Sequence, residues 1–397
     1  MGEQGWVRAG AALLATLGVL AGGPAASAAT PASRVPRDGP AGNAFYAPRQ
    51  VSPGRPGDVV WSSPIISPAG SRAWKILYHS RAVDGRDVVV SGIVITPTAK
   101  PPSGGWPVVT WAHGTEGLAD ACAPSKALDI AYRIPGIQSF IKQGYVVVAT
   151  DYQGLGTPGE HPYLVGVSEG RGVLDIARAA HEMSPANAST KVLVYGHSQG
   201  GQAALFAGQI AATYAPDLHL LGVAAVAPVS DLTELLPEAT ATPAALGYAV
   251  MAAVGFHAAY PDTNLASVLT PLAIAGLGYV DQHCAADVID HYAEFTPSQI
   301  IAQSPLIVPA FAALLQQNTA GTVATAAPLF IAQGDRDELV PKPTTDQYVQ
   351  RACGVGDHIL YRVYPGQDHI GARDASVKDI QAWMAARVAG QPAPSTC

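Results

Sequence analysis

The chain has 397 residues, of which 48% are hydrophobic and 13% are charged. This composition is enough to bury the core of one large domain or two ordinary domains, and it excludes a chain that is disordered throughout. The formal net charge is −7, and Lys and Arg form no run. Nucleic-acid binding is thereby excluded, because neutralising phosphates requires a basic face.

The first residues differ from the rest of the chain. Arg8 precedes an apolar run, GAALLATLGVLAG, and Ala26-Ser27-Ala28 then provides the small residues of an export cleavage site. The run is shorter than the roughly 20 apolar residues that a membrane-spanning helix needs. We therefore predict a signal peptide over residues 1–28, no transmembrane anchor, and a secreted, extracellular protein.

The remaining chain predicts an α/β fold. Residues 29–60 are rich in Pro, Gly and Ser, which indicates an extended N-terminal lead-in. Continuous apolar runs then predict strands that are buried on both faces, as in a parallel sheet covered by helices. The predicted strands lie on either side of a turn at Asp84-Gly85 and within residues 104–114, 144–154, 191–196, 220–228, 327–337 and 358–369.

Helical patterns alternate with these strands at residues 168–183, 199–215 and 377–389. This alternation predicts a doubly wound, mostly parallel sheet. The core comprises residues 61–230 and 323–397. Residues 231–322 contain no clear strand, and we predict a helical cap or lid inserted over the edge of the sheet where ligands bind.

The cysteines are Cys122, Cys284, Cys353 and Cys397. An even number of widely spaced cysteines in an exported chain predicts two disulfides. Three pairings remain open. The chain contains no Cys-x-x-Cys and no other cluster of ligands, so we expect neither a metal nor an organic cofactor.

Two stretches match Gly-x-Ser-x-Gly, around Ser168 and Ser198. The pattern marks a nucleophile only where a buried strand ends at the first Gly and a helix begins after the Ser. Ser198 meets this condition, since Val192–Tyr195 forms the strand and residues 202–206 continue as helix. Ser168 follows a segment broken by prolines, and we predict that it is the N-cap of the 168–183 helix.

A serine nucleophile needs a histidine base, and the histidine needs an acid, which in this fold follow in the order Ser, acid, His. Asp337 is the predicted acid because it leaves room for the loop after Gly334 to bend back, and Asp335 is the alternative. His369 is the predicted base because it follows the last strand, whereas His358 precedes it. The predicted catalytic residues are therefore Ser198, Asp337 and His369.

The oxyanion of the reaction needs two backbone donors. One is predicted to be the N–H of Gln199, the residue after the nucleophile. The second comes either from the loop that contains Thr115 or from the segment that begins at Asp151. Both segments follow predicted strands.

At this point the sequence resembles a known family. The segments AHGTEGLADACAPS (112–125), GYVVVATDYQGLGTPGEHPYLVG (144–166) and YGHSQGGQAA (195–204), with GDRDELVP and GQDH, resemble the secretory lipase family. The resemblance implies an α/β-hydrolase core with a helical cap, and it carries the family's triad onto Ser198, Asp337 and His369. It also favours Asp151 as the second oxyanion residue and a Cys353–Cys397 disulfide. His197 and Gln199 depart from the aromatic residue and the Gly that flank the serine in the fungal enzymes.

These observations predict a secreted serine carboxylic-ester hydrolase, a lipase or esterase, that cleaves acylglycerols or similar lipid esters through an acyl-enzyme. The cap is the expected contact with a lipid interface. The alternatives are an acyltransferase with the same triad, a short-chain carboxylesterase, and a non-catalytic binding protein. Product partition between water and an added alcohol separates a transferase from a hydrolase.

Overall fold

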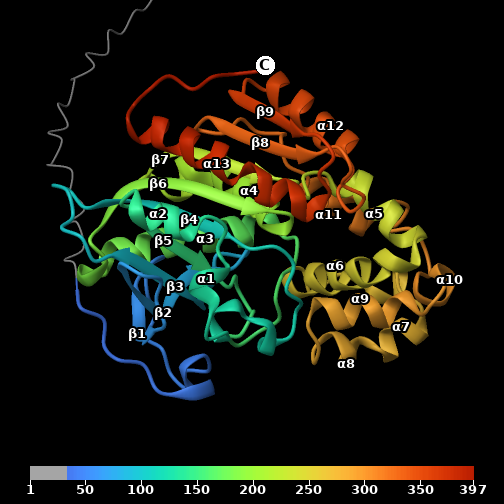
Figure 1. Ribbon diagram of the computed structural model, residues 1–397. Helices are drawn as coiled ribbons and strands as arrows, with labels where there is room; N and C mark the ends of the chain where they lie inside the picture. Colours follow the sequence, from blue (N-terminus) through green and yellow to red (C-terminus); the bar gives the residue numbers. More distant parts are fainter. Residues whose placement is uncertain (1–33) are drawn as a thin grey trace, which may run out of the picture. The chain divides into compact units, whose positions relative to one another are not determined.

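The computed structural model describes residues 34–397, so the predicted signal peptide and the start of the lead-in lie outside the described residues. Nine strands form one sheet in the order β1-β2-β3-β5-β4-β6-β7-β8-β9 (Figure 1). Their bounds are Val59–Ile65 (β1), Ser71–Arg81 (β2), Asp87–Pro97 (β3), Trp106–Ala112 (β4), Val146–Thr150 (β5), Ala188–His197 (β6), His219–Val226 (β7), Leu329–Gly334 (β8) and Ile359–Tyr364 (β9).

The sheet has an antiparallel end and a parallel body. β1, β2 and β3 form an antiparallel ribbon, and β3 pairs antiparallel with β5. All neighbours from β5 to β9 are parallel. β1 was not predicted as a strand because it begins inside the unpatterned lead-in and contains Pro64, which an edge strand tolerates.

Helices cover both faces of the sheet, which confirms the predicted doubly wound, mostly parallel architecture. α3 (Gly166–Glu182), α4 (Gln199–Tyr214) and α12 (Lys342–Gly354) pack on one face, and α1 (Ile130–Arg133), α2 (Ile137–Lys142) and α13 (His369–Val388) pack on the other. Every residue of β5 and β8 is buried, as expected for continuous apolar runs.

A helical segment separates β7 from β8, and it contains no strand in the described chain. Its helices are α5 (Leu232–Ala241), α6 (Leu246–Ala259), α7 (Pro271–Ala275), α8 (Leu277–Val280), α9 (Ala285–Ala293), α10 (Pro297–Ile300) and α11 (Pro309–Gln317). The segment has a hydrophobic core of its own, to which Tyr163, Leu164 and Val165 also contribute. None of the helices described over residues 34–397 is both long and apolar enough to cross a membrane.

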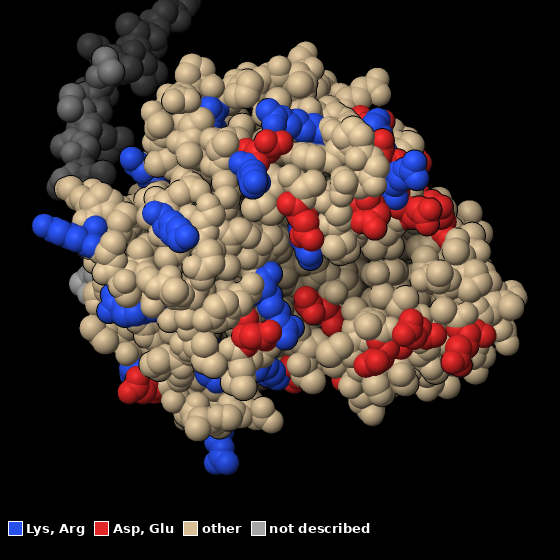
Figure 2. Space-filling view, viewed as in Figure 1, with Lys and Arg blue, Asp and Glu red and all other residues tan. Residues whose placement is uncertain are grey.

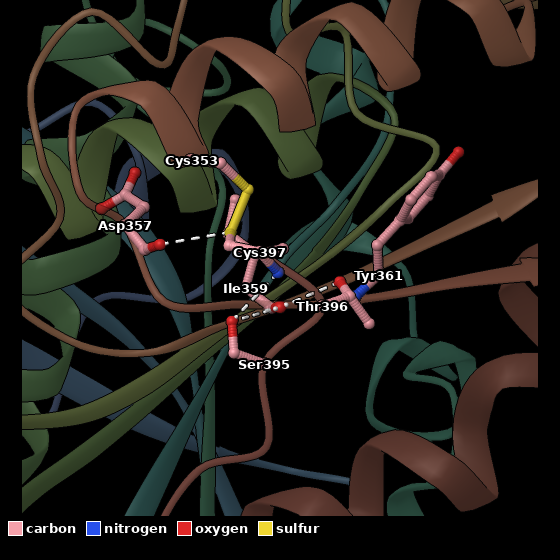
Figure 3. The surroundings of a disulfide bond; sticks show 7 residues. All are labelled: Cys353, Asp357, Ile359, Tyr361, Ser395, Thr396 and Cys397. Atoms are coloured by element: carbon pink, nitrogen blue, oxygen red, sulfur yellow. Dashed lines mark hydrogen bonds between the residues drawn. A yellow bond between two sulfur atoms is a disulfide. The ribbon is translucent and has the colours of Figure 1, made fainter.

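Two disulfides connect distant parts of the fold. Cys122–Cys284 joins the loop after β4 to the start of α9, and Cys353–Cys397 joins α12 to the end of the chain. Figure 3 shows that the C-terminal residues lie along β9, where the Thr396 N–H donates to the Ile359 carbonyl at 2.7 Å and the Tyr361 N–H donates to the Thr396 hydroxyl at 3.0 Å. The second disulfide therefore fixes a tail that covers the free edge of the sheet.

Candidate active site

Ser198 occupies a sharp turn between β6 and α4. β6 ends at His197 and α4 begins at Gln199, so Ser198 joins them with φ 60° and ψ −122°. A residue other than glycine rarely adopts this backbone conformation, which persists only where neighbouring contacts enforce it. Here the Ser198 N–H donates to the Val226 carbonyl at 3.0 Å, and its carbonyl accepts from the Gln202 N–H at 3.1 Å.

Three glycines allow the backbone to close around this turn. A Cβ on Gly196 would fall on the Gly200 carbonyl, and a Cβ on Gly200 would fall on the Ala112 carbonyl. A Cβ on Gly201 would lie 2.8 Å from the Pro228 Cα. The strand and helix therefore approach each other more closely than any side chain would permit, which is the geometry that a nucleophile elbow requires.

Asp337 and His369 form a hydrogen-bonded pair near this turn. The His369 Nδ1 lies 2.8 Å from the Asp337 Oδ2. The carboxylate is also oriented by the N–H groups of Leu339 and Val340, at 3.0 and 2.8 Å, and by the Gln333 amide at 3.1 Å. An acid held by several donors fixes both the ring and the tautomer of its histidine partner.

The alternative acid has another role. The carboxylate of Asp335 accepts the Gly366 N–H at 2.6 Å, and Asp335 is exposed, whereas Asp337 is 5% exposed. Asp335 thus links the loops after β8 and β9. His358 lies immediately before β9, at the end of the strand away from Ser198.

Ser198 and His369 line the same cavity, which has a volume of about 780 Å³. The His369 Nε2 is buried and has no hydrogen-bond partner among the described residues. The structure therefore brings Ser198 to the same cavity as His369, which is paired with Asp337.

His197 supports the position of His369. Its Nε2 lies 3.0 Å from the His369 carbonyl, and the two rings have centroids 4.5 Å apart. Burial, with a smaller contribution from His369, lowers the pKa of His197 to about 3. His197 is therefore neutral at physiological pH, and it donates a hydrogen bond without adding a second positive charge beside the candidate base.

The candidate oxyanion donors lie on two segments. A Cβ built on Gly114 would lie 3.6 Å from the Ser198 Cβ, so the Gly114–Thr115 backbone runs beside the serine. Thr115 lines the cavity. Within residues 34–397, the N–H groups of Thr115 and Gln199 donate to no other backbone group, so both are available to a ligand.

The structure does not place Asp151 where its predicted oxyanion role requires. Its N–H donates to the Ser91 carbonyl at 2.8 Å, and its carboxylate accepts from the Ser91 hydroxyl at 2.6 Å and from the Ser125 N–H and hydroxyl. Burial raises the pKa of Asp151. Its N–H and carboxylate are thus engaged with β3 and with the loop after β4, and it lines neither cavity near Ser198.

A second cavity of about 380 Å³ meets the first at Ser198. Thr115, Tyr248 and Leu339 also line both cavities. The remaining wall is mostly aliphatic and comes largely from the helical segment, with Leu232, Leu235, Leu236, Ala239, Ala244 and Ala245. Glu238 and Glu338 also line this second cavity. The first cavity includes cationic as well as acidic side chains, namely Lys126, Arg133 and Arg373 with Glu116.

The prediction that Ser168 caps a helix is wrong. α3 begins two residues earlier, at Gly166, and Ser168 lies inside its first turn, where its hydroxyl donates to the Gln153 amide oxygen at 2.8 Å. The Asn318 side chain accepts the Gly166 N–H at 2.9 Å. A residue from the distant helical segment therefore binds a free N–H of this helix start, which a local cap would otherwise have served.

The described residues contain no group of three or more His, Cys, Asp or Glu that could hold a metal ion. The cavity around Ser198 brings together a strained serine, a histidine–carboxylate pair and backbone N–H groups. This combination suits attack on a carbonyl carbon with stabilisation of the resulting oxyanion.

Comparison with known proteins gives a consistent picture. Residues 122–396 match the family model described as secretory lipase. The secreted triacylglycerol lipase LIP4 of Malassezia globosa is 26% identical over 352 residues, which cover 82% of this chain and 74% of that protein. Lipase A of Moesziomyces aphidis is 25% identical over 393 residues, which cover 89% of this chain and 82% of that protein.

Solved structures resemble the fold. The X-ray structure of Candida antarctica lipase A has a TM-score of 0.74 and 21% identity, covering 87% of this chain and 84% of that chain. The rice cell wall degrading esterase LipA from Xanthomonas oryzae has a TM-score of 0.70 and 20% identity, covering 85% of this chain and 97% of that chain. The sheet and its helices therefore have the α/β-hydrolase architecture.

Proposed function

This chain belongs to the secretory lipase family and hydrolyses lipid esters, and from this premise we propose which of its residues perform the reaction. Ser198 is the nucleophile, His369 is the general base and acid, and Asp337 orients His369. The observation that carries this proposal is the elbow conformation of Ser198 in a cavity that His369, paired with Asp337, also lines.

The reaction has two halves. The Ser198 Oγ attacks the ester carbonyl carbon while its proton passes to the His369 Nε2. The tetrahedral intermediate collapses, the bond to the alcohol oxygen breaks, and His369 gives that proton to the departing alcohol. Water then attacks the acyl-enzyme in the same way and releases the carboxylic acid. Asp337 accepts the Nδ1–H of His369 in both halves.

The N–H groups of Gln199 and Thr115 form the oxyanion hole. Both are free of other acceptors, and the Gly114–Thr115 backbone runs beside Ser198. Thr115 thus replaces Asp151 in this role. The Thr115 hydroxyl lies 2.7 Å from the hydroxyl of Tyr163, which ties the loop to the segment before α3. Donors that are already oriented stabilise the developing charge without reorganisation.

The two cavities divide the substrate. His369 lines the first cavity and not the second, and it must protonate the leaving alcohol, so the alcohol lies in the first cavity. The acyl chain then occupies the second cavity, whose aliphatic wall comes from α5 and the residues after it. The substrate class is therefore an ester of an apolar acid, with the more polar alcohol part facing Glu116, Lys126 and Arg373.

The helical segment 231–322 acts as a cap over the acyl cavity and contacts neutral lipid. It contains eight Asp or Glu residues and no Lys or Arg, and its face in Figure 2 shows this absence of cations. Leu272 and Ile307 on this segment are 51% and 70% exposed. Cations attract anionic lipids, so a segment without them favours a neutral ester surface. The chain is exported, which suits its two disulfides.

A labelling experiment and a substrate series test this proposal. A fluorophosphonate should add to Ser198 alone, as mapped by peptide mass spectrometry, and abolish hydrolysis. A series of p-nitrophenyl esters should show kcat/KM rising with acyl length until the second cavity is full. Labelling of another residue, or an active enzyme that the reagent does not touch, would refute the assignment of the nucleophile.

A further inference from the structure

Two buried residues, Glu169 and His161, hold the side chain of Gln199. Its Nε2 lies 2.8 Å from the Glu169 Oε1 and 3.1 Å from the His161 Nε2. The His161 Nδ1 lies 2.9 Å from the Gln153 carbonyl, so Nδ1 carries the proton and Nε2 accepts. Both side-chain amide hydrogens of Gln199 therefore have an acceptor. These bonds fix the side chain of the residue whose backbone N–H is the proposed oxyanion donor.

Glu169 is the centre of this arrangement. It is fully buried in the first turn of α3, and its Oε1 accepts a second hydrogen bond from the Leu164 N–H at 2.9 Å. Leu164 has a φ of 58° and lines the acyl cavity. One carboxyl oxygen thus connects the start of α4 to the wall of the acyl cavity.

The other oxygen of Glu169 has a different environment. Its Oε2 is buried and has no hydrogen-bond partner in the described structure. An ionised carboxylate carries negative charge on both oxygens, and burying either oxygen without a donor is costly. In the neutral acid the unpaired oxygen is an uncharged hydroxyl, whose burial costs less. The geometry therefore favours the neutral acid.

We propose that Glu169 is a positioning residue for the reaction, which acts as a neutral carboxylic acid and fixes the oxyanion donor through the Gln199 side chain. The inference rests on the proposed function of Gln199. Any rotation of the 198–199 peptide away from the oxyanion would pull the Gln199 amide from Glu169 and His161. Neutrality matters because a negative charge behind the donor would oppose the negative charge that develops in front of it.

The charged and titratable groups around Glu169 agree with this state. Burial raises the pKa of Glu169 to about 8 and lowers the pKa of His161 to about 4, so both are neutral at pH 7. Tyr152 and Tyr163 face the same space, and burial raises the pKa of each. No Lys or Arg pairs with Glu169 among the described residues, and the His161 Nε2, 4.0 Å away, belongs to a neutral ring.

Two substitutions separate the hydrogen bond from the charge. Glu169→Gln keeps an oxygen for Leu164 and Gln199 but cannot ionise. Its kcat at pH 7 should stay within about twofold of wild type. Glu169→Leu removes the acceptor, and its kcat should fall at least about 10-fold with KM nearly unchanged, because misplacing a transition-state donor affects the chemical step. Hydrolysis of a soluble short-chain ester is followed in a pH-stat.

The dependence of kcat on pH distinguishes this positioning role from a merely structural one. Wild-type kcat should fall above about pH 8, and Glu169→Gln should lose that fall. Ser168→Ala, which alters a neighbouring side chain of α3 that does not touch Gln199, is the matched control and should keep the wild-type profile.

An unchanged kcat in Glu169→Leu, or the same alkaline fall in Glu169→Gln as in wild type, would overturn the inference. Fluorophosphonate labelling of Ser198 in the wild type is independent of these results. Failure of that labelling would instead overturn the proposed function, so the two failures are distinguishable. If Glu169→Leu does not fold, the pH profile of Glu169→Gln decides the question alone.

Discussion

The stretches at residues 166–170 and 196–200 share the pattern Gly-x-Ser-x-Gly but build different structures. Ser198 joins a strand to a helix and has a φ of 60°, whereas Ser168 lies within the first turn of α3. Ser198 opens onto two cavities, and Ser168 donates to the partly buried side chain of Gln153. The same five-residue pattern therefore marks a reactive turn in one place and a helix start in the other.

The glycines of the two stretches are needed for different reasons. A Cβ on Gly196 or Gly200 would collide with main-chain atoms where β6 turns into α4. A Cβ on Gly166 would fall on the ring of Phe206, and one on Gly170 would lie 2.8 Å from the Ala207 nitrogen. The second pair thus allows α3 to pack against α4. Glycine in this pattern therefore indicates only that two segments pack closely. Whether the serine is reactive depends on whether that packing leaves its side chain at a cavity.

The largest expected difference between the stretches is in catalysis. Ser198→Ala should lower kcat at least about 10⁴-fold because it removes the atom that forms the acyl-enzyme. Ser168→Ala should leave kcat within about twofold. Initial rates on a p-nitrophenyl ester measure both. Equal losses of kcat in the two variants would show that Ser198 and Ser168 do not differ in their importance for catalysis.

A slightly smaller effect is expected at the partner of the base. Asp337→Asn should lower kcat by about 10³- to 10⁴-fold, because an amide at this position favours the wrong tautomer of His369. The matched control is Asp335→Asn on the same loop, which should change kcat by less than about threefold, since the Asp335 carboxylate bonds only the Gly366 N–H in the structure described. A greater loss of kcat in Asp335→Asn than in Asp337→Asn would show that Asp335, and not Asp337, is the acid that orients His369.

The sequence was most informative where the structure depends on neighbouring residues. The apolar run before Gly196 and the helix-forming residues after Gly201 are local signals, and the strand and helix lie where they predict. The order Ser, acid, His and the positions of Asp337 and His369 after predicted strands were also readable, because strand ends of a parallel sheet converge at one edge.

Contacts between distant residues were not readable in the same way. Asn318 binds the start of α3 from 152 residues away, so no local pattern could exclude a cap at Ser168. The choice between Thr115 and Asp151 depended on which loop crosses beside Ser198, and the structure has Asp151 holding Ser91 and Ser125 instead. Glu169 had a signal, a charged residue inside a glycine pattern, but its burial became evident only when α3 and α4 were packed.

Buried titratable groups near both stretches make stability depend on pH in opposite directions. Burial lowers the pKa of His113 and His161 to about 4 and of His197 to about 3, from 6.5. The unfolded chain therefore takes up protons that the folded chain refuses, and the free energy of unfolding should fall as the pH drops from about 6.5 to about 4. Urea unfolding at several pH values measures this fall.

Glu169 should act on the alkaline side of that curve. Its raised pKa, about 8 against 4.5, means that the folded chain keeps a proton which the unfolded chain releases, so its contribution destabilises the fold as the pH rises from about 4.5 to about 8. Glu169→Gln should become progressively more stable than wild type across this range, by at most about 1.4 kcal/mol per pH unit. A constant difference between the two proteins from pH 5 to pH 8 would contradict the neutral, buried acid.

The smallest effect is expected from the Ser168 hydroxyl itself. It donates one partly buried hydrogen bond to the Gln153 side chain, and Gln153 in turn provides the carbonyl that accepts from His161. Ser168→Ala should therefore cost about 1 kcal/mol of unfolding free energy, which is typical of one neutral hydrogen bond that leaves its acceptor unpaired. Urea unfolding at pH 7 measures this loss. A loss of several kcal/mol, accompanied by a change in the pH profile of kcat, would mean that Ser168 reaches the Gln199 network through Gln153. The two stretches would then be coupled through Ser168 as well as through Glu169.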